Sequence, residues 1–381
     1  MQLERFDAAA FLRDTWQRKP LLIRNPWKDW HNPLDPDELA GLACEDAVES
    51  RLVTMSDKGY ALENGPLAED RFATLGTRDW TLLVQSVDHH VPAVAELIEP
   101  FRFVPDWRLD DVMVSYAADG GGVGPHFDNY DVFLVQGLGR RRWQLGARCD
   151  DATPLLPHDD LRLLAEFEPV EEWVLEPGDM LYVPPGIAHN GVAVGDDCMT
   201  YSIGFRAPSE YDLIEGWTDD ILDGLGEDRR YADPGLPLQP NPGEITEEAL
   251  SRLHETVTRK LADRAAFVRW FGRYNSAPKN PEIEWGPENP VSTEEVRKAI
   301  DAGVAIVRNP ASRFSFVAGT NGDVLLFADG ECFECAGDSA LFAKALCAQV
   351  RFVPDSGLAR NDDALRRIAR LCTSGSIAFA G

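Results

Sequence analysis

The sequence predicts an α+β protein of several domains, with a strand-rich first half, a helical middle and a small mixed unit at the end. Residues 1–207 contain short apolar runs separated by Gly and Pro turns, residues 241–275 carry a helical apolar stripe, and residues 291–372 alternate between helix and hairpin patterns. A chain of 381 residues also exceeds the usual size of one domain.

The first half is predicted to form an all-β barrel or sandwich core. We expect a short helix at Phe6–Trp16 and a buried strand at Lys19–Asn25, and further apolar runs follow at Asp79–Val84 and within Asp110–Gly124. Residues 171–208 contain short strand patterns cut by Pro-Gly, Pro-Pro-Gly and Gly-Asp turns. Closely spaced strands and turns of this kind are typical of barrels and sandwiches.

One long amphipathic helix is predicted within Asn241–Asn275, with Thr246 as its N-cap, and a second helix at Glu210–Leu225. The apolar residues of the long helix recur three or four positions apart, namely Leu250, Leu253, Val257, Leu261, Ala265, Val268 and Phe271. Such a stripe has to be buried, so we expect it to pack on the barrel or on a second copy of the chain.

The end of the chain predicts a winged-helix unit after a proline-rich linker at Ser276–Pro290. A capped helix at Val291–Gly303 precedes two strands around the turn at 319–322, and two more helices follow. Winged helices often bind DNA, but this segment is not notably basic. We therefore expect a structural or protein-contact role and no direct DNA binding.

The composition is that of an acidic globular protein, with 44% hydrophobic residues, 27% charged residues and a net charge of −27. A surface this acidic repels nucleic acid and attracts basic partners, although adaptation to a salty cytoplasm would give the same charge. No apolar run reaches the roughly eighteen residues of a membrane span, and the N-terminus has no basic-then-apolar leader. The seven cysteines are odd in number and scattered, which favours the reducing cytoplasm.

A metal site is predicted from His126, Asp128 and His189. His126 and Asp128 stand two positions apart, so in a strand their side chains would point to the same face. His189 follows the rigid Pro-Pro-Gly turn at 184–186 and can supply a third ligand from another strand. Two histidines and one carboxylate are the facial triad of non-haem Fe(II) oxygenases, whereas structural zinc normally takes four N or S ligands.

Three consecutive arginines, Arg140, Arg141 and Arg142, can anchor an anionic co-substrate. An oxygenase of this type usually needs 2-oxoglutarate, whose far carboxylate requires a cation inside the barrel, and a guanidinium takes a carboxylate bidentately. By strand alternation Arg141 shares a face with Trp143, and Arg140 shares the other face with Arg142. The alternation does not decide which face is inward, and a basic strand end at the surface would also explain the cluster.

Several segments resemble the bacterial JmjC-type cupin ribosomal oxygenases, the YcfD/RoxA family of arginine hydroxylases. They are VSYAADGGGVGPHFDNYDVFLVQGLGRRRWQLG at 114–146, EPGDMLYVPPGIAHNG at 176–191, YSIGFRAP at 201–208, and FLRDTWQRKPLLIRN at 11–25. The resemblance implies a double-stranded β-helix (JmjC/cupin) catalytic domain at 1–207, a helical dimerisation region at 208–278 and a winged-helix domain at 279–381. A homodimer is implied as well.

The resemblance also implies the reaction and its site. An Fe(II)- and 2-oxoglutarate-dependent oxygenase would use molecular oxygen to hydroxylate an arginine side chain of large-subunit ribosomal protein sixteen. His126, Asp128 and His189 match the iron ligands of the family, and Arg141 and Ser115 match its 2-oxoglutarate contacts. The sequence does not depart from the family pattern at these five positions.

Substrate contacts are indicated only by chemistry and position, because a basic arginine side chain needs acidic or aromatic lining. Tyr130 would share the ligand face by alternation, and Asp131 is adjacent, but each is also compatible with barrel packing or a surface carboxylate. Three other functions stay open: histidyl hydroxylation or methyl-lysine demethylation by the same kind of site, a non-catalytic metal-binding cupin scaffold, and a DNA-binding regulator with a sensory barrel.

Overall fold

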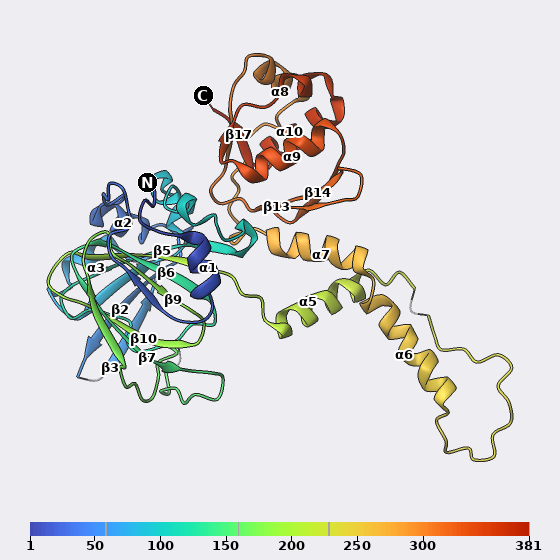
Figure 1. The fold of residues 1–381 in the computed structure, drawn as a ribbon, viewed down its shortest axis with the longest axis horizontal. Helices are drawn as coiled ribbons and strands as arrows, with labels where there is room; N and C mark the ends of the chain where they lie inside the picture. Colours follow the sequence, from blue (N-terminus) through green and yellow to red (C-terminus); the bar gives the residue numbers. More distant parts are fainter. Residues whose placement is uncertain (58, 159, 228, 381) are drawn as a thin grey trace. The chain divides into compact units, whose positions relative to one another are not determined.

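A computed structural model describes residues 1–57, 59–158, 160–227 and 229–380. The chain divides into two compact units, Met1–Ala207 with Asn309–Ala311, and Pro208–Arg308 with Ser312–Gly381 (Figure 1). No helix in the described part of the chain is both long and apolar enough to cross a membrane.

The first unit is built on two antiparallel sheets. The larger sheet has eight strands in the order β1-β9-β6-β11-β5-β4-β2-β3, and the smaller has three in the order β10-β7-β8. Their bounds are β1 (Leu21–Ile23), β2 (Ser50–Ser56), β3 (Gly59–Asn64), β4 (Trp80–Val84), β5 (Leu109–Ala117), β6 (Asp131–Leu138), β7 (Arg141–Arg148), β8 (Glu171–Leu175), β9 (Met180–Val183), β10 (Ile187–Ala193) and β11 (Cys198–Phe205). Short helices accompany them: α1 (Ala8–Asp14), α2 (Pro36–Leu42), α3 (Glu69–Ala73), α4 (Pro92–Ala95) and the 3-10 turns Val87–His89, Glu99–Phe101 and Asp106–Arg108.

The central strand β6 separates two cores because its side chains alternate between the faces of the sheet. Phe133 and Val135 belong to the core formed with the N-terminal helices, which includes Phe11 of α1. Val132 and Leu134 point the other way, into the core between the two sheets. The interior of the barrel is therefore a distinct apolar compartment.

The second unit contains helices and two small sheets. Its helices are α5 (Glu210–Asp223), α6 (Glu247–Leu261), α7 (Arg264–Ser276), α8 (Thr293–Asp301), α9 (Asp338–Ala348) and α10 (Asp362–Thr373), with a 3-10 turn at Ser356–Arg360. Its strands are β12 (Ile306–Arg308), β13 (Phe314–Ala318), β14 (Val324–Ala328), β15 (Glu331–Cys335), β16 (Arg351–Phe352) and β17 (Ile377–Phe379), in the orders β16-β12-β17 and β13-β14-β15. The hairpin predicted around residues 319–322 is β13–β14.

The single long helix predicted within Asn241–Asn275 is wrong, because the structure has two helices there. Thr246 caps α6 as predicted, since its hydroxyl accepts the Ala249 amide at 3.3 Å. Asp263 then caps a new helix, because its carboxylate accepts the Ala266 amide at 3.0 Å. The apolar periodicity continues across this break, so periodicity alone does not reveal it.

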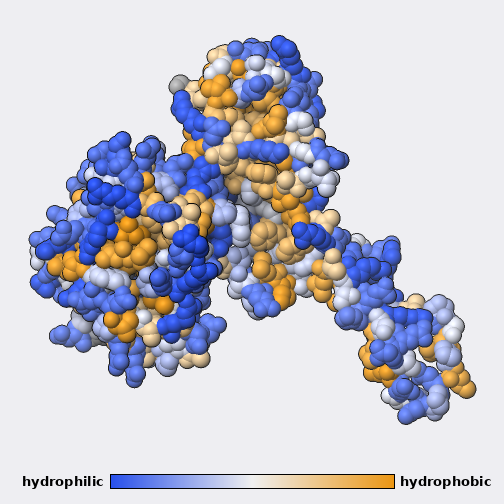
Figure 2. Space-filling view, viewed as in Figure 1, coloured by the Kyte–Doolittle hydropathy of each residue, from blue (hydrophilic) through white to orange (hydrophobic). Residues whose placement is uncertain are grey.

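The break gives the two halves of the predicted stripe different surroundings. On α7, Trp270 packs against Trp217 of α5, with ring centroids 5.6 Å apart. On α6, all four apolar stripe residues are largely exposed: Leu250 by 47%, Leu253 by 45%, Val257 by 59% and Leu261 by 43%. Apolar surface is visible in orange over the helical part of the second unit in Figure 2. Within the described part of the chain the α6 stripe is therefore left largely uncovered, and exposed apolar surface of this kind is typical of interaction sites.

Candidate metal and co-substrate site

His126 and Asp128 lie in the loop that precedes β6, so the prediction that they alternate along a strand is wrong. The strand begins only at Asp131. His126 instead forms an isolated antiparallel bridge with His189 of β10, in which the two backbone amides donate to the opposite carbonyls at 3.0 and 2.8 Å. This bridge, rather than strand alternation, brings the predicted ligands together.

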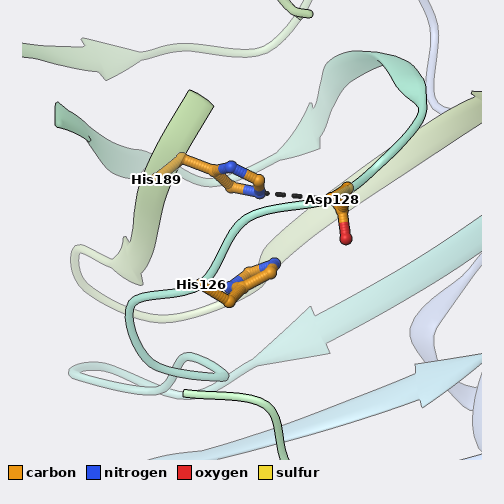
Figure 3. A group of neighbouring side chains, drawn as sticks. All are labelled: His126, Asp128 and His189. Carbon is orange, nitrogen blue, oxygen red and sulfur yellow. Dashed lines mark ion pairs between the residues drawn. The ribbon is translucent and has the colours of Figure 1, made fainter. Parts of the chain in front are cut away.

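The three predicted ligands point toward one another (Figure 3). One ligand atom from each of His126, Asp128 and His189 lies within 4.8 Å of the other two. His189 Nε2 is 3.6 Å from Asp128 Oδ2, and the centroids of the two imidazole rings are 4.3 Å apart. Such spacing suits a single ion held between the three side chains.

Backbone carbonyls fix the orientation of both imidazoles. His126 Nδ1 lies 2.8 Å from the Gly124 carbonyl, and His189 Nδ1 lies 2.9 Å from the Ile187 carbonyl. Since a carbonyl can only accept, each Nδ1 carries the proton and each Nε2 keeps its lone pair for a metal. Burial, and then the neighbouring His126, lower the pKa of His189 to about 4, so its ring is neutral at physiological pH.

The Pro-Pro-Gly turn before His189 is tied directly to the loop that carries Asp128. The Gly186 amide donates to the Asp128 carbonyl at 2.7 Å. Gly186 has a φ of +77°, a conformation that favours glycine and positions this amide. This hydrogen bond therefore fixes the position of the turn before His189 relative to Asp128.

The donor set fits Fe(II). It consists of two imidazole nitrogens and one carboxylate oxygen, and within the described ranges these three residues form the whole group of metal-binding side chains. A facial set of three leaves coordination positions open for a co-substrate and oxygen.

Arg141 points into the barrel and has an unused donor there. Along β7, Arg141 and Trp143 are buried while Arg142 is exposed, which settles the face that alternation left open. Arg141 Nε donates to Cys198 Sγ at 3.4 Å, but its Nη2 is buried without a hydrogen-bond partner in the described structure. A buried guanidinium with an unpaired donor is costly, so the site favours an incoming anion.

Ser115 belongs to the same interior face. It lies on β5 directly opposite Thr200 of β11, and only 3% of its surface is exposed. Thr200 in turn lies opposite Gln136 of β6 and donates to its Oε1 at 3.3 Å. Ser115 thus stands in a row of polar side chains within an otherwise apolar barrel.

Four polar residues of this interior were missed in the sequence: Thr81, Gln136, Cys198 and Thr200. Gln136 follows Val132 and Leu134 on the inward face of β6, and Thr81 Oγ1 is buried without a hydrogen-bond partner among the described residues. A polar residue that continues an inward apolar alternation was the available signal. These residues come together because strands distant in sequence pair with one another, and the sequence does not reveal that pairing.

Tyr130 and Asp131 have different surroundings. Burial of the Tyr130 hydroxyl, and then the nearby Asp128 carboxylate, raise the pKa of the phenol well above its usual range, while 44% of the residue is exposed. Asp131 is fully buried, and its carboxylate accepts from Tyr182 at 2.6 Å and from Gln17 at 2.9 Å and pairs with Arg108 at 3.1 Å. These contacts tie the start of β6 to the N-terminal segment and leave the carboxylate engaged by three partners, as in a structural residue.

Gly191→Ala is expected to disturb the metal site through Trp143. A Cβ at Gly191 would lie 2.6 Å from the Trp143 ring, whose centroid is 5.9 Å from that of His189. We expect a loss of about 1–3 kcal/mol in stability, as overpacking typically costs, and weaker metal binding. Thermal unfolding and cobalt titration measure both effects. Gly76→Ala, where nothing lies within 4 Å of the added Cβ, should leave both unchanged; equal effects of the two substitutions would contradict this expectation.

Two facing antiparallel sheets with a His-x-Asp and a distant His at their mouth define a JmjC-type oxygenase, and comparison with known proteins agrees. The JmjC domain model matches residues 96–213, and the ROXA-like winged helix model matches residues 259–376. The chain belongs to the JmjC-type ribosomal oxygenases, a family of 2-oxoglutarate-dependent enzymes that use iron.

The similarity extends over the whole chain. It is 37% identical over 373 residues to the ribosomal protein uL16 3-hydroxylase of Escherichia coli (strain K12), covering 97% of each chain. It is 39% identical over 275 residues to a probable ribosomal oxygenase of Haemophilus influenzae, covering 70% of this chain and 67% of that protein. The X-ray structure of E. coli ycfD matches with a TM-score of 0.90 at 34% identity, covering 100% of both chains.

Another structure of the E. coli protein was solved in complex with cobalt and 2-oxoglutarate, and it matches with a TM-score of 0.87 at 34% identity, covering 100% of this chain and 99% of that one. These findings confirm the family resemblance, the fold class, the class of enzyme and the cofactors predicted from the sequence.

Proposed function

We propose that the protein hydroxylates an arginine side chain of the large-subunit ribosomal protein uL16. The observation that carries the oxygenase chemistry is the presence, inside one barrel, of the His126–Asp128–His189 group and the buried Arg141 with an unpartnered Nη2. The substrate is proposed from the similarity to the E. coli uL16 3-hydroxylase. The overall reaction converts 2-oxoglutarate, dioxygen and a C–H bond into succinate, carbon dioxide and a C–OH bond.

Each site residue has a role in this proposal. His126 and His189 bind Fe(II) through Nε2, and Asp128 binds it through a carboxylate oxygen. Arg141 and Ser115 bind the far carboxylate of 2-oxoglutarate. When bound, the iron and 2-oxoglutarate supply the oxidising chemistry that inserts one oxygen atom into a C–H bond. The chain itself positions both molecules, and the apolar interior around Leu134 limits access of water.

Tyr130 is proposed as a substrate contact. It follows Asp128 by two positions and 44% of it is exposed, so an incoming side chain can pack on its ring. An aromatic face attracts a guanidinium. The net charge of −27 also favours association with a basic ribosomal protein.

The proposal is tested by mass spectrometry of ribosomal proteins from cells that lack this protein. They are incubated with the enzyme, Fe(II), 2-oxoglutarate and oxygen, and the His126→Ala variant is the control. A gain of one oxygen on an uL16 arginine, absent from the control, is expected. Succinate without oxygen on any ribosomal protein would contradict the substrate, and bound iron without succinate would favour a binding scaffold.

A histidyl hydroxylase or lysine demethylase is the second candidate, because part of the chain resembles such enzymes. The chain is 33% identical over 131 residues to the bifunctional lysine-specific demethylase and histidyl-hydroxylase NO66 of Caenorhabditis briggsae, covering 32% of this chain and 16% of that protein. Fragmentation of the modified peptide distinguishes oxygen on arginine from oxygen on histidine. Loss of methyl groups from a methyl-lysine peptide would favour demethylation.

We propose that the winged-helix part contacts protein rather than DNA. The arginines of its α10 are engaged by acidic residues: Arg367 pairs with Asp363, and Arg370 Nη2 lies 2.8 Å from Glu331 Oε1. Charges compensated in this way contribute little to phosphate binding.

We place the protein in the cytoplasm, which suits a ribosomal substrate and seven cysteines that form no disulfide in the described structure.

We propose the domain division 1–207, 208–278 and 279–381, and a homodimer formed by the middle region.

The double substitution Leu253→Glu and Val257→Glu in the exposed α6 stripe is expected to weaken dimerisation at least roughly tenfold, because charges would enter an apolar interface. Sedimentation velocity over a concentration series measures the change. Ser251→Glu, on a neighbouring exposed position of α6, is the control. A double variant that associates like the unmodified chain would contradict this use of the stripe.

A further inference from the structure

We infer that Cys198 is a positioning residue for 2-oxoglutarate. Its sulfur holds one edge of the Arg141 guanidinium and leaves the two terminal nitrogens to the far carboxylate of the co-substrate. This inference rests on the proposed function, in which Arg141 binds that carboxylate.

The contact that carries the inference is specific and fully buried. Arg141 Nε donates to Cys198 Sγ at 3.4 Å, and Cys198 has no exposed surface. Cys198 clusters with Ala117 and Ala193. Ala117 lies on β5 directly opposite Cys198, and Ala193 lies on β10 directly opposite Arg141. The thiol and the guanidinium are therefore both confined by small apolar neighbours.

This contact decides which nitrogens of the Arg141 guanidinium can bind the carboxylate of the co-substrate. A guanidinium is planar and can grip a carboxylate either with Nε and one terminal nitrogen or with the two terminal nitrogens. Because Nε already donates to Cys198, the first edge is partly used. Nη2, which is buried without a partner in the described structure, remains available. The carboxylate is thus expected to meet the end of Arg141 rather than its side.

Sulfur suits this role because it orients a cation without neutralising it. A thiol is a weak, uncharged acceptor. Cys198 Sγ also accepts from Gln136 Nε2 at 3.5 Å, so two donors from separate strands converge on it. A carboxylate at this place would instead form an ion pair with Arg141 and compete with 2-oxoglutarate. The positive charge of Arg141 therefore stays available to bind the far carboxylate of 2-oxoglutarate.

The test compares two keto acids that differ at the far carboxylate. Calorimetry on the cobalt-loaded full chain measures binding of 2-oxoglutarate and of 2-oxobutanoate, which lacks that group. Cys198→Ala is expected to weaken 2-oxoglutarate about fivefold, the scale of one modest hydrogen bond, and to leave 2-oxobutanoate unchanged. Cys198→Ser, which keeps an acceptor, should recover most of the loss. Cys372→Ala, at a buried thiol in α10, is the matched control and should change neither.

Several outcomes would overturn the inference. Equal weakening of both keto acids, or loss of cobalt binding, would show a general structural role for Cys198. Unchanged 2-oxoglutarate binding in Cys198→Ala would remove the role altogether. Failure of the underlying function has a different result: Arg141→Ala would then bind 2-oxoglutarate as well as the unmodified chain does.

Discussion

Asp128→Ala is expected to abolish turnover and to reduce metal affinity well beyond the roughly 10–100-fold that follows removal of an outer-shell partner of a ligand. The substitution removes the only carboxylate of the ligand group and leaves two imidazoles. It also removes the carboxylate that lies 3.6 Å from His189 Nε2, so His189 loses its anionic neighbour. Cobalt titration followed by its absorption spectrum, together with a succinate assay, measures both effects.

The neighbouring Asn129 provides the matched control for this prediction. It is exposed and lies next to Asp128 in the same loop. Asn129→Ala should keep both metal affinity and turnover. Retention of metal binding and turnover in Asp128→Ala would contradict the assignment of the ligand group.

Arg141→Met is expected to raise the KM for 2-oxoglutarate roughly a hundredfold, since two charge-assisted hydrogen bonds are lost at about 1.5 kcal/mol or more each. The same substitution should not destabilise the unliganded protein and can stabilise it, because it removes a buried cation whose Nη2 has no partner in the described structure. Weaker binding of 2-oxoglutarate together with an unchanged or higher stability of the unliganded protein is the result expected for a site that binds an anion.

Arg142→Met on the same strand is the control, because its side chain is exposed while that of Arg141 is buried. It should change neither the KM nor the melting temperature. A large loss of stability in unliganded Arg141→Met would show that the buried guanidinium mainly stabilises the fold, and would contradict its role as a co-substrate anchor.

The metal group was predictable because its members carry strong local signals. The Pro-Pro-Gly turn before His189 and the spacing of His126 and Asp128 were sufficient to name all three residues. The reasoning from strand alternation nevertheless failed, because β6 begins only at Asp131, after both His126 and Asp128. The ligands meet through a two-residue bridge between distant segments, which local periodicity does not encode.

The co-substrate side of the site was less predictable. Alternation grouped Arg141 with Trp143, but only the packing of the two sheets decides that this face is inward. Cys198 and Gln136 are 62 residues apart and meet at a hydrogen bond only because β11 pairs with β6. In the helical region, Asp263 caps a second helix, but the apolar period continues across this position and concealed the break.

The proposed reaction is tested most directly by supplying isotopically heavy dioxygen to the enzyme, Fe(II), 2-oxoglutarate and unmodified uL16. Mass spectrometry should find one heavy oxygen atom in an arginine side chain of uL16 and one in succinate, because the two atoms of dioxygen are divided between the two products. Heavy oxygen in succinate alone would contradict uL16 as the substrate. Heavy oxygen in neither product would contradict the assignment of the His126–Asp128–His189 group as an oxygenase centre.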